Sequence, residues 1–306
     1  MSPEIRQVLR GLAHNRLPGF NFPANFLELS FDEVGDGEAR LSVRPGPHAI
    51  DREGRMSLPA LGVLADLGLA APVRHRFGAG ARMATVALQL QFTGAPATGA
   101  LVARGLLDAV LEGASERQGL TRVAIHAGET LVCTGTGAFI VMGGPDATPP
   151  LPMRRADDFI EAPLAPEALT APEREVLARA EAAMKPARGE RSFIERFMGV
   201  APRRTAKGAT LRCPNGLQIG NRVGHVQGGI SLALAAATAN RALGEEWMLS
   251  SIAAWYVSPG IGREIRGRAR IAHLGRRTAV VQTTLTNDGA DAMLQATSSH
   301  ARRAAS

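Results

Sequence analysis

The hydrophobic pattern of this chain predicts one arrangement that occurs twice. Each half contains a long run of apolar and small residues, beginning at Leu58 and at Gly228, with the character of a buried helix. Segments of alternating apolar and polar residues follow each run, as expected for strands. They cover residues 83–93, 100–112, 116–127 and 131–142, then 248–257, 264–272, 278–286 and 292–299. A curved sheet can cover a helix that is apolar on most sides. We therefore predict an α+β fold in which each half is a central helix wrapped by an antiparallel meander.

Local sequence signals agree with this division. Gly128-Glu129 and Asn287–Gly289 are typical of hairpin turns, because glycine and asparagine accept positive φ angles. The segment before each apolar run is also related, with Asp51-Arg52-x-Gly54 in the first half and Asn221-Arg222-x-Gly224 at a constant offset of 170 residues in the second. Such self-similarity indicates an internal repeat.

A proline-rich stretch separates the two halves. Seven prolines lie between residues 145 and 172, a density that prevents continuous helix or sheet. We predict an N-terminal domain over residues 1–143, a linker over 144–170 and a C-terminal domain over 171–306, with a short helix at 173–184.

Composition narrows the class of protein. Of the 306 residues, 45% are hydrophobic and 21% charged, which is typical of a globular protein with a substantial core. The net charge of +7 favours an anionic partner, but the arginines are spread between strand-like segments and aromatic residues are only 4%, so nucleic acid is not indicated. The longest weakly polar run, 230–239, is too short to span a membrane, and no secretion signal is visible, so we expect a cytoplasmic protein. Cys133 and Cys213 lie far apart, which indicates neither a disulfide framework nor a metal site.

The segment Asn221-Arg222-x-Gly224-x-x-Gln227-Gly228-Gly229, followed at once by a helix, resembles the signature of the PaaI-like acyl-CoA thioesterases. That family has Asn-x-x-Gly-x-x-His-Gly-Gly, with glutamine as a variant of the histidine, and an acidic residue nine positions after it. The resemblance covers both halves and implies a tandem, or double, hotdog fold. It also implies that active sites lie between two hotdog units, with the glycine loop from one unit and the acid from the other.

Neither half matches this pattern completely. In the second half, Ala236 stands at the acidic position; in the first, Ser57-Leu58-Pro59 replaces the glycine segment, but the acid is present as Asp66. The resemblance therefore implies one complete site, built from Asp66 of the first half and Asn221, Gln227 and Gly228 of the second. The reciprocal site, from Asp51, Ser57, Leu58 and Ala236, is expected to be inactive. The family's Ser or Thr after the helix corresponds to Thr85, with Leu249 in the other half.

The residues themselves support parts of this interpretation. On a helix, Asp66 has only apolar neighbours three and four positions away, so we expect burial to raise its pKa. The amide of Gly228, at the positive end of a helix, can stabilise an oxyanion. Structural explanations also exist, because Asp66 could pair within the fold and Gly228 could serve only the entry turn and close packing. Asn221 and Gln227 would orient the substrate or brace the loop.

The predicted function is thioesterase hydrolysis of an acyl-CoA-type substrate, with Asp66 as base or nucleophile and Thr85 positioning water. Coenzyme A would enter as part of the substrate, and no separate cofactor or metal is expected. The alternative is a non-catalytic protein that binds or senses acyl-CoA. No Gly-x-Ser-x-Gly elbow and no Asp-x-x-x-x-His occurs, which disfavours an α/β-hydrolase and a hotdog hydratase. Because hotdog units pair and fused pairs often pair again, a homodimer is expected.

Overall fold

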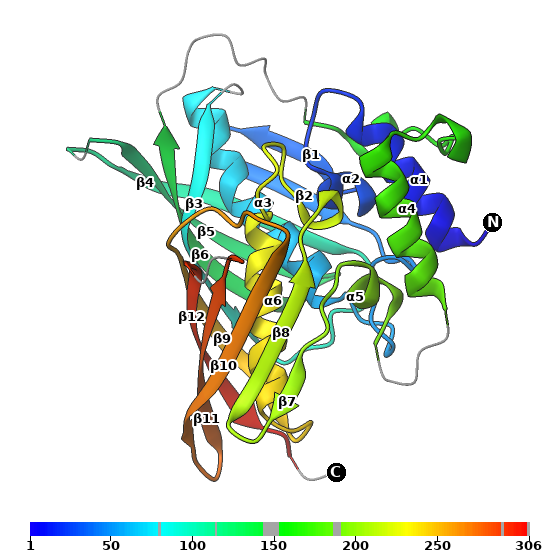
Figure 1. The fold of residues 1–306 in the computed structure, drawn as a ribbon. Coiled ribbons are helices and arrows are strands. Elements are labelled where there is room, and N and C mark those ends of the chain that lie inside the picture. The colour runs from blue at the N-terminus through cyan, green and yellow to red at the C-terminus, as the bar shows by residue number, and fades with distance from the viewer. Residues whose placement is uncertain (79–80, 114, 143–152, 186–190, 289–290, 305–306) are drawn as a thin grey trace.

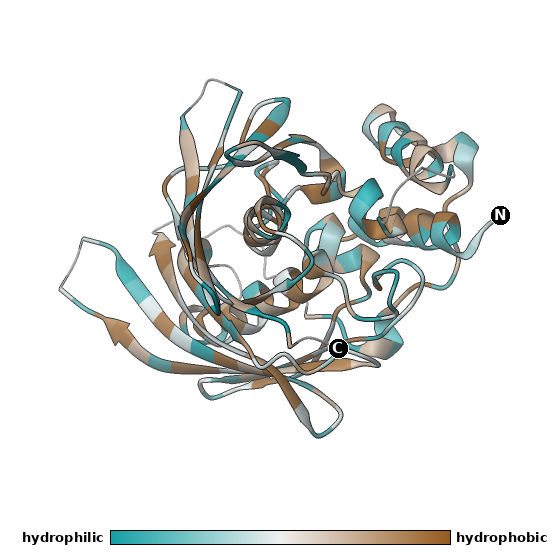
Figure 2. Cartoon of the chain, turned by 90° about the horizontal axis from the view of Figure 1, so that it is seen from below, coloured by the Kyte–Doolittle hydropathy of each residue, from teal (hydrophilic) through white to brown (hydrophobic). Residues whose placement is uncertain are grey.

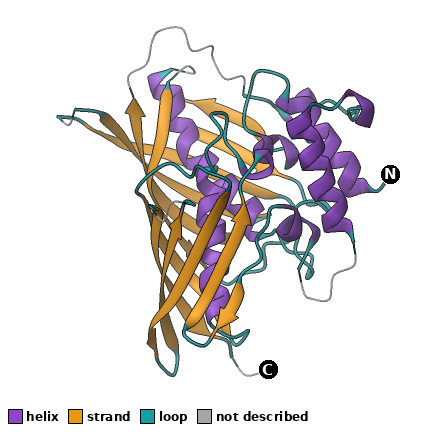
Figure 3. Ribbon diagram, in the orientation of Figure 1, coloured by secondary structure: helices purple, strands orange, loops and turns teal. Residues whose placement is uncertain are grey.

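Helices and strands occur in the same order in the two halves of the chain (Figures 1 and 3). The computed structural model describes residues 1–78, 81–113, 115–142, 153–185, 191–288 and 291–304. The first half contains α1 (Pro3–Asn15), α2 (Phe22–Phe26), β1 (Ser30–Gly35), β2 (Glu38–Val43), α3 (Leu58–Phe77), β3 (Arg82–Phe92), β4 (Leu101–Leu111), β5 (Arg117–Ala127) and β6 (Thr130–Met142). The second contains α4 (Ala171–Met184), α5 (Phe193–Phe197), β7 (Arg203–Thr205), β8 (Gly208–Pro214), α6 (Gly228–Ala242), β9 (Trp247–Tyr256), β10 (Glu264–Leu274), β11 (Thr278–Thr286) and β12 (Ala292–Arg302). The predicted helices and strands are thus confirmed to within a few residues.

The strands of the described residues form one antiparallel sheet in the order β1-β2-β4-β5-β6-β3-β9-β12-β11-β10-β8-β7. Each half has the same internal order, and β3 pairs with β9 to join the halves. The predicted simple meander is wrong in one respect. Strands β4, β5 and β6 are consecutive hairpins, but β3 pairs with β6 instead of β4, and β9 likewise pairs with β12. This crossover places the first strand after each helix at the junction of the halves.

The predicted central helices are confirmed, and the sheet curves around them (Figure 2). The α3 helix is apolar and mostly buried around its circumference, and α6 is similar. Each begins with a side-chain cap on its third amide: Ser57 Oγ accepts from Ala60 N in α3, and Gln227 Oε1 accepts from Ile230 N in α6. The cap therefore stands at the same point in both halves despite the different residue.

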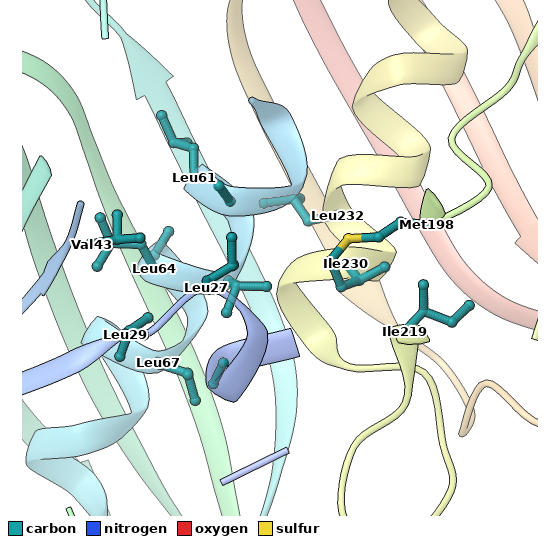
Figure 4. Close-up of a cluster of buried hydrophobic side chains, with 14 of the residues drawn as sticks. Leu27, Leu29, Val43, Leu61, Leu64, Leu67, Met198, Ile219, Ile230 and Leu232 are labelled. Atoms are coloured by element: carbon teal, nitrogen blue, oxygen red, sulfur yellow. The ribbon is translucent and has the colours of Figure 1, made fainter. Parts of the chain in front are cut away.

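The two central helices approach each other through glycine. A Cβ atom added to Gly62 of α3 would meet the carbonyl oxygen of Gly229 of α6, and one added to Gly229 would meet the carbonyl of Gly62. Around this crossing, Leu61 and Leu232 belong to the buried apolar cluster that continues between the helices and α2 (Figure 4). Close backbone contact and apolar packing thus fix the position of α3 relative to α6.

The described part of the predicted linker packs against the first half. It holds short 3₁₀ helices at Ala156–Asp158 and Pro166–Ala168. A further 3₁₀ helix, Leu217–Ile219, lies outside the linker and precedes α6. Arg154 is buried, and its guanidinium donates to Asn25 Oδ1 at 3.0 Å and contacts His14 Nδ1 at 3.3 Å. Residues 144–152, with four of the seven prolines, and Gly289 of the second predicted turn lie outside the described residues.

None of the helices in the described ranges is both long and apolar enough to cross a membrane. Cys133 and Cys213 are both buried free thiols.

We predict that Gly62→Ala destabilises the protein by about 1–3 kcal/mol, because the new methyl group meets rigid backbone of α6. In an open helical position the same change would stabilise by up to about 1 kcal/mol. Urea unfolding followed by circular dichroism measures the difference. Gly35→Ala is the control, since a Cβ there has no heavy atom within 4 Å. Equal stability of the two variants would contradict the close crossing.

Candidate active site

Asp66 lies in the middle of α3 and is only 5% exposed. Thr85 Oγ1 of β3 donates to Asp66 Oδ1 at 3.0 Å, and Gln227 Nε2 donates to Asp66 Oδ2 at 2.6 Å. The backbone N–H of Gly229 donates to the same carboxylate. The predicted burial of Asp66 is confirmed, and its partners come from both halves of the chain.

Burial raises the pKa of Asp66 from 3.8 to about 6, while the donors Thr85 and Gly229 act in the opposite direction. The carboxylate is therefore ionised at neutral pH but much more basic than an exposed aspartate. A group with these properties can accept a proton near physiological pH.

A bulge in β3 directs Thr85 towards Asp66. The register of β3 against β6 shifts between Thr85 and Ala87, so Val86 is the extra residue. Such a bulge re-aims the neighbouring side chain, here towards the helix inside the sheet. The pairing of β12 with β9 shifts at the corresponding place, next to Leu249, which offers no hydroxyl.

Gln227 performs two tasks with one side chain. Its Oε1 caps α6 and its Nε2 holds the Asp66 carboxylate. The sequence predicts that Gln227 orients the substrate or braces the loop; its Oε1 braces the start of α6, and its Nε2 contacts the acid in addition. Gln227 is 2% exposed, which makes it a positioning residue.

Gly228 begins α6 directly beside this carboxylate. A Cβ atom at Gly228 would lie 2.8 Å from Asp66 Oδ1, 2.9 Å from Oδ2 and 2.9 Å from Thr85 Oγ1. No larger residue fits without displacing these groups. In the first turn of a helix the N–H groups have no partner within the helix. Here the N–H of Ile230 donates to Gln227 Oε1, and the N–H of Gly229 donates to Asp66. Gly228, in contrast, is partly exposed at the positive end of the helix dipole.

Tyr256 completes the arrangement, although it was not among the site residues predicted from the sequence. Its hydroxyl donates to the carbonyl oxygen of Gly228 at 2.7 Å, so it fixes the peptide that follows this residue. Burial and the nearby charge of Asp66 raise the pKa of Tyr256 well above 10, which keeps the phenol protonated. A signal was available, since Tyr256 is the only tyrosine of the chain and Phe92 occupies the corresponding end of β3.

Asn221 does not take part in these contacts. Its Oδ1 accepts from the amides of Val223 and His225, both at 3.0 Å, so it braces the loop before α6. Asp51 braces the first-half loop with the same pattern, accepting from the amides of Glu53 and Arg55. Of the two roles considered for Asn221, the structure supports the bracing role.

The reciprocal position is narrow and apolar. Leu58, Phe92 and Ala236 line a cavity of about 10 Å³ whose other walls are also apolar, formed by Leu61, Gly62, Leu90, Leu232, Ala233 and Ile252. This space holds a single water at most. Ser57 is buried as the cap of α3. The two faces of the helix pair therefore differ in chemistry, with a carboxylate and its donors on one and hydrocarbon on the other.

A much larger open concavity, of about 720 Å³, lies elsewhere, lined by residues of β3, β4, β5 and β6. Its charged residues are Arg104 and Arg122, and Arg122 is ion-paired with Asp108 at 3.1 Å. It offers no carboxylate, thiol or histidine to act as base or nucleophile. Within the described ranges, no group of three or more His, Cys, Asp and Glu side chains could hold a metal ion.

One family model matches part of the second half of the chain. Residues 219–301 match the family model of the acyl-CoA thioesterase N-terminal domain, a segment that contains Gln227, Gly228 and Tyr256 but not Asp66. No curated protein sequence matched the chain.

Solved structures resemble about nine-tenths of the chain. A candidate oleoyl thioesterase from Lactobacillus plantarum has a TM-score of 0.54 and 13% identity over 89% of this chain and 98% of its own. A candidate thioesterase from Novosphingobium aromaticivorans has a TM-score of 0.54 and 15% identity over 90% and 99%. A hot dog protein of unknown function from Alicyclobacillus acidocaldarius has a TM-score of 0.54 and 11% identity over 91% and 96%. At these identities the likeness shows the fold, and the predicted hotdog fold is confirmed.

We predict that Ala236→Asp destabilises the protein by about 3 kcal/mol or more at pH 8, because it buries a carboxylate among hydrocarbon. Ala182→Asp, at an exposed position of α4, is the control and is expected to cost less than about 1 kcal/mol. Urea unfolding measures both. If the two variants were equally stable, the reciprocal position would not be the narrow apolar cavity described above.

Proposed function

We propose that this protein hydrolyses thioesters of the acyl-CoA type at one composite site between its two halves. The observation that carries the proposal is the position of the Asp66 carboxylate, which is held by Gln227 of the second half and lies against Gly228. Neither half supplies this arrangement alone. The PaaI-like subtype indicated by the sequence is part of the proposal.

In the proposed reaction, the thioester carbonyl oxygen binds to the N–H of Gly228. This amide lies at the positive end of α6, and the Tyr256 bond holds the next peptide, Gly228–Gly229, in place. As water attacks the carbonyl carbon, negative charge develops on the oxygen, and the amide stabilises it more strongly than it stabilises the ground state. A side chain at position 228 would obstruct this approach.

Asp66 then serves as the general base. It takes a proton from the attacking water, the tetrahedral intermediate expels the thiolate, and the proton is returned to the sulfur, which yields a carboxylic acid and a free thiol. Thr85, whose hydroxyl already contacts Asp66, is placed to hold the water. Direct attack by Asp66, with an anhydride that water then opens, is the variant of this mechanism that uses the same groups.

A protein that only binds or senses acyl-CoA would share the fold and the pocket. The catalytic proposal is favoured by complementarity between the halves. The acid and hydroxyl are retained in the first half, while the glycine, the amide cap and the tyrosine are retained in the second. Binding alone does not require a basic carboxylate beside an amide donor. Tight binding of acyl-CoA without release of thiol would identify the sensor.

We predict that Asp66→Asn lowers kcat for acyl-CoA hydrolysis by at least about 100-fold, because the amide cannot accept the proton. The variant remains folded, and its free energy of unfolding at pH 8 rises by up to about 3 kcal/mol. The raised pKa means that ionised Asp66 destabilises the fold, and this cost is fully present above about pH 6. Thiol release and urea unfolding measure the two effects. Unchanged kcat in the folded variant would refute the assignment.

The pH profile provides an independent prediction. Asp66 must be ionised to act as base, so log kcat/KM rises by about one per pH unit up to pH 6 and then levels. Tyr256 titrates far above this range, and Thr85 and Gln227 do not titrate. Initial rates between pH 4.5 and 8.5 test this. A profile with its inflection near 4, or with none, would contradict the buried carboxylate as base.

A further inference from the structure

Exposed apolar side chains gather at one place in the second half of the chain. Trp255 is 52% exposed near the end of β9, and Val257 is 58% exposed just after it. The loop that follows carries Ile261, which is 48% exposed, and the loop before α6 carries Val223, which is 67% exposed. We call these four residues the apolar rim. They are four of the nine large hydrophobic residues that are exposed in the described ranges, so their grouping is not a general property of the surface.

The two loops of the apolar rim are joined by backbone contacts. The Val226 N–H, at the end of one loop, donates to Gly260 O of the other at 2.9 Å. A Cβ atom added to Gly260 would lie 2.9 Å from the Cβ of Val226, so the two segments touch. The Val257 N–H continues the strand ladder beyond β9 by donating to Met293 O at 2.9 Å. Alternate residues of a strand share one face, so Trp255 and Val257 both lie on the outer face of the sheet.

The indole of Trp255 receives little cover from the sheet. Its cross-strand partners are Ala87 on β3 and Gln295 on β12, which offer it little apolar surface. Single exposed apolar residues are common on protein surfaces, but an exposed apolar group around a tryptophan marks an interaction surface. Tyr256, the next residue, points inward and contacts Gly228, so the apolar rim borders the candidate site.

The corresponding positions in the first half are all polar and exposed. Matching backbone contacts align the loops, since the Met56 N–H donates to Ala97 O just as the Val226 N–H donates to Gly260 O. The strand ends are aligned by the bulge that each strand contains. The fold itself therefore does not require apolar residues at these positions. In place of Val223, Trp255, Val257 and Ile261, the first half has Glu53, Gln91, Thr93 and Thr98.

Cations border the apolar rim, and its loops contain no acids. Arg222 and Arg263 are exposed, one in each loop. Residues 221–225 and 257–263 include no aspartate or glutamate. In the first half, the loop 51–55 has two acids and two arginines, and thus no net charge. The apolar rim therefore differs from its counterpart in charge as well as in hydrophobicity.

Two acids beside the second loop are already bound within the fold. Asp288 accepts from the amides of Arg263 and Glu264 at 2.7 and 2.8 Å. Glu264 is itself paired with two arginines. Residues 191–306 as a whole carry sixteen lysines and arginines against six aspartates and glutamates. The surface around the apolar rim therefore attracts anions.

We propose that the apolar rim and its two arginines bind this protein to the surface of an anionic membrane. Tryptophan, with an apolar ring and a polar N–H, suits the level of the lipid headgroups, and aliphatic side chains beside it insert among the lipid chains. Neighbouring cations are attracted by acidic lipids. The protein lies on the membrane through two loops and a strand end and does not cross it. This contact requires no thioester chemistry, so it is independent of the proposed function.

A second copy of the chain fits this surface less well. Most homodimers have two-fold symmetry, in which a surface patch meets its own equivalent. Arg222 and Arg263 would then approach the same two arginines of the other copy, and the loops hold no acid to receive them. An anionic membrane instead supplies the opposite charge across the whole patch.

Flotation of the full chain with lipid vesicles tests the proposal. We expect binding to phosphatidylcholine vesicles that contain about one-third phosphatidylglycerol, at least about tenfold weaker binding without the anionic lipid, and loss of this difference at high salt. Trp255→Gln and Val257→Thr, which introduce the residues of the first half, each weaken binding by about five- to tenfold. Leu274→Thr is the control and leaves binding unchanged. Leu274 is 59% exposed but lies about 33 Å away along β10, at the end opposite the loop (Figure 1).

Tryptophan fluorescence gives a second readout. The chain has two tryptophans, and Trp247→Phe leaves Trp255 as the only one. With anionic vesicles its emission is expected to shift to shorter wavelength and to be quenched by brominated lipid, because the indole leaves water. The double variant Arg222→Gln, Arg263→Gln is expected to bind anionic vesicles at least about tenfold more weakly, with an unchanged circular dichroism spectrum.

Several results would overturn the proposal. It fails if the protein does not bind anionic vesicles, if Trp255→Gln and Val257→Thr bind as well as the unaltered chain, or if Leu274→Thr loses as much binding as they do. If Trp255→Gln instead changes the mass measured by light scattering in the absence of lipid, the apolar rim is a contact between copies and the membrane proposal is wrong. Val257→Thr keeps the test decisive if Trp255→Gln does not fold.

Discussion

The hydrogen bond between Gln227 and Asp66 is the contact on which the site depends. It joins a helix cap of the second half to a carboxylate buried in the first, and it is short, at 2.6 Å. A buried carboxylate is costly unless donors surround it, and Asp66 obtains them from Thr85, Gln227 and Gly229. These groups meet because β3 pairs with β9 and because α3 and α6 touch at glycine. The interface between the halves thus determines where donors can surround the buried acid.

The two equivalent positions at the interface between the halves differ in chemistry. On one, polar groups are paired around Asp66, and the pKa of the acid remains raised, as the proposed role of a base near neutral pH requires. On the other, Leu58, Phe92 and Ala236 form an apolar contact that stabilises the interface. The equivalent position in the other half thus carries no buried charge.

Much of this arrangement could be predicted from the sequence. Apolar runs and alternating segments located the central helices and the strands, and the offset of 170 residues related Asp51 to Asn221 and Asp66 to Ala236. The contact of Asp66 with Thr85 and Gly228 followed from combining the two incomplete patterns.

The sequence pattern does not predict which strands pair over a long range. The position of β3 between β6 and β9 depends on the curvature of the sheet, which alternation does not encode. The bond of Tyr256 to Gly228 likewise depends on how the halves pack together. The second contact of Gln227, from Nε2 to Asp66, was not predicted, because spacing identifies a helix cap but not what its second polar atom contacts.

The central claim is that one thioester binds with its carbonyl between Gly228 and Asp66, across the join. A crystal structure with a non-hydrolysable thioether analogue of acyl-CoA that retains a carbonyl measures this most directly. The account predicts that the carbonyl oxygen lies about 3 Å from the Gly228 nitrogen with Asp66 on the adjacent side. An analogue bound instead between Leu58 and Ala236, or in the open concavity lined by Arg104 and Arg122, would contradict it.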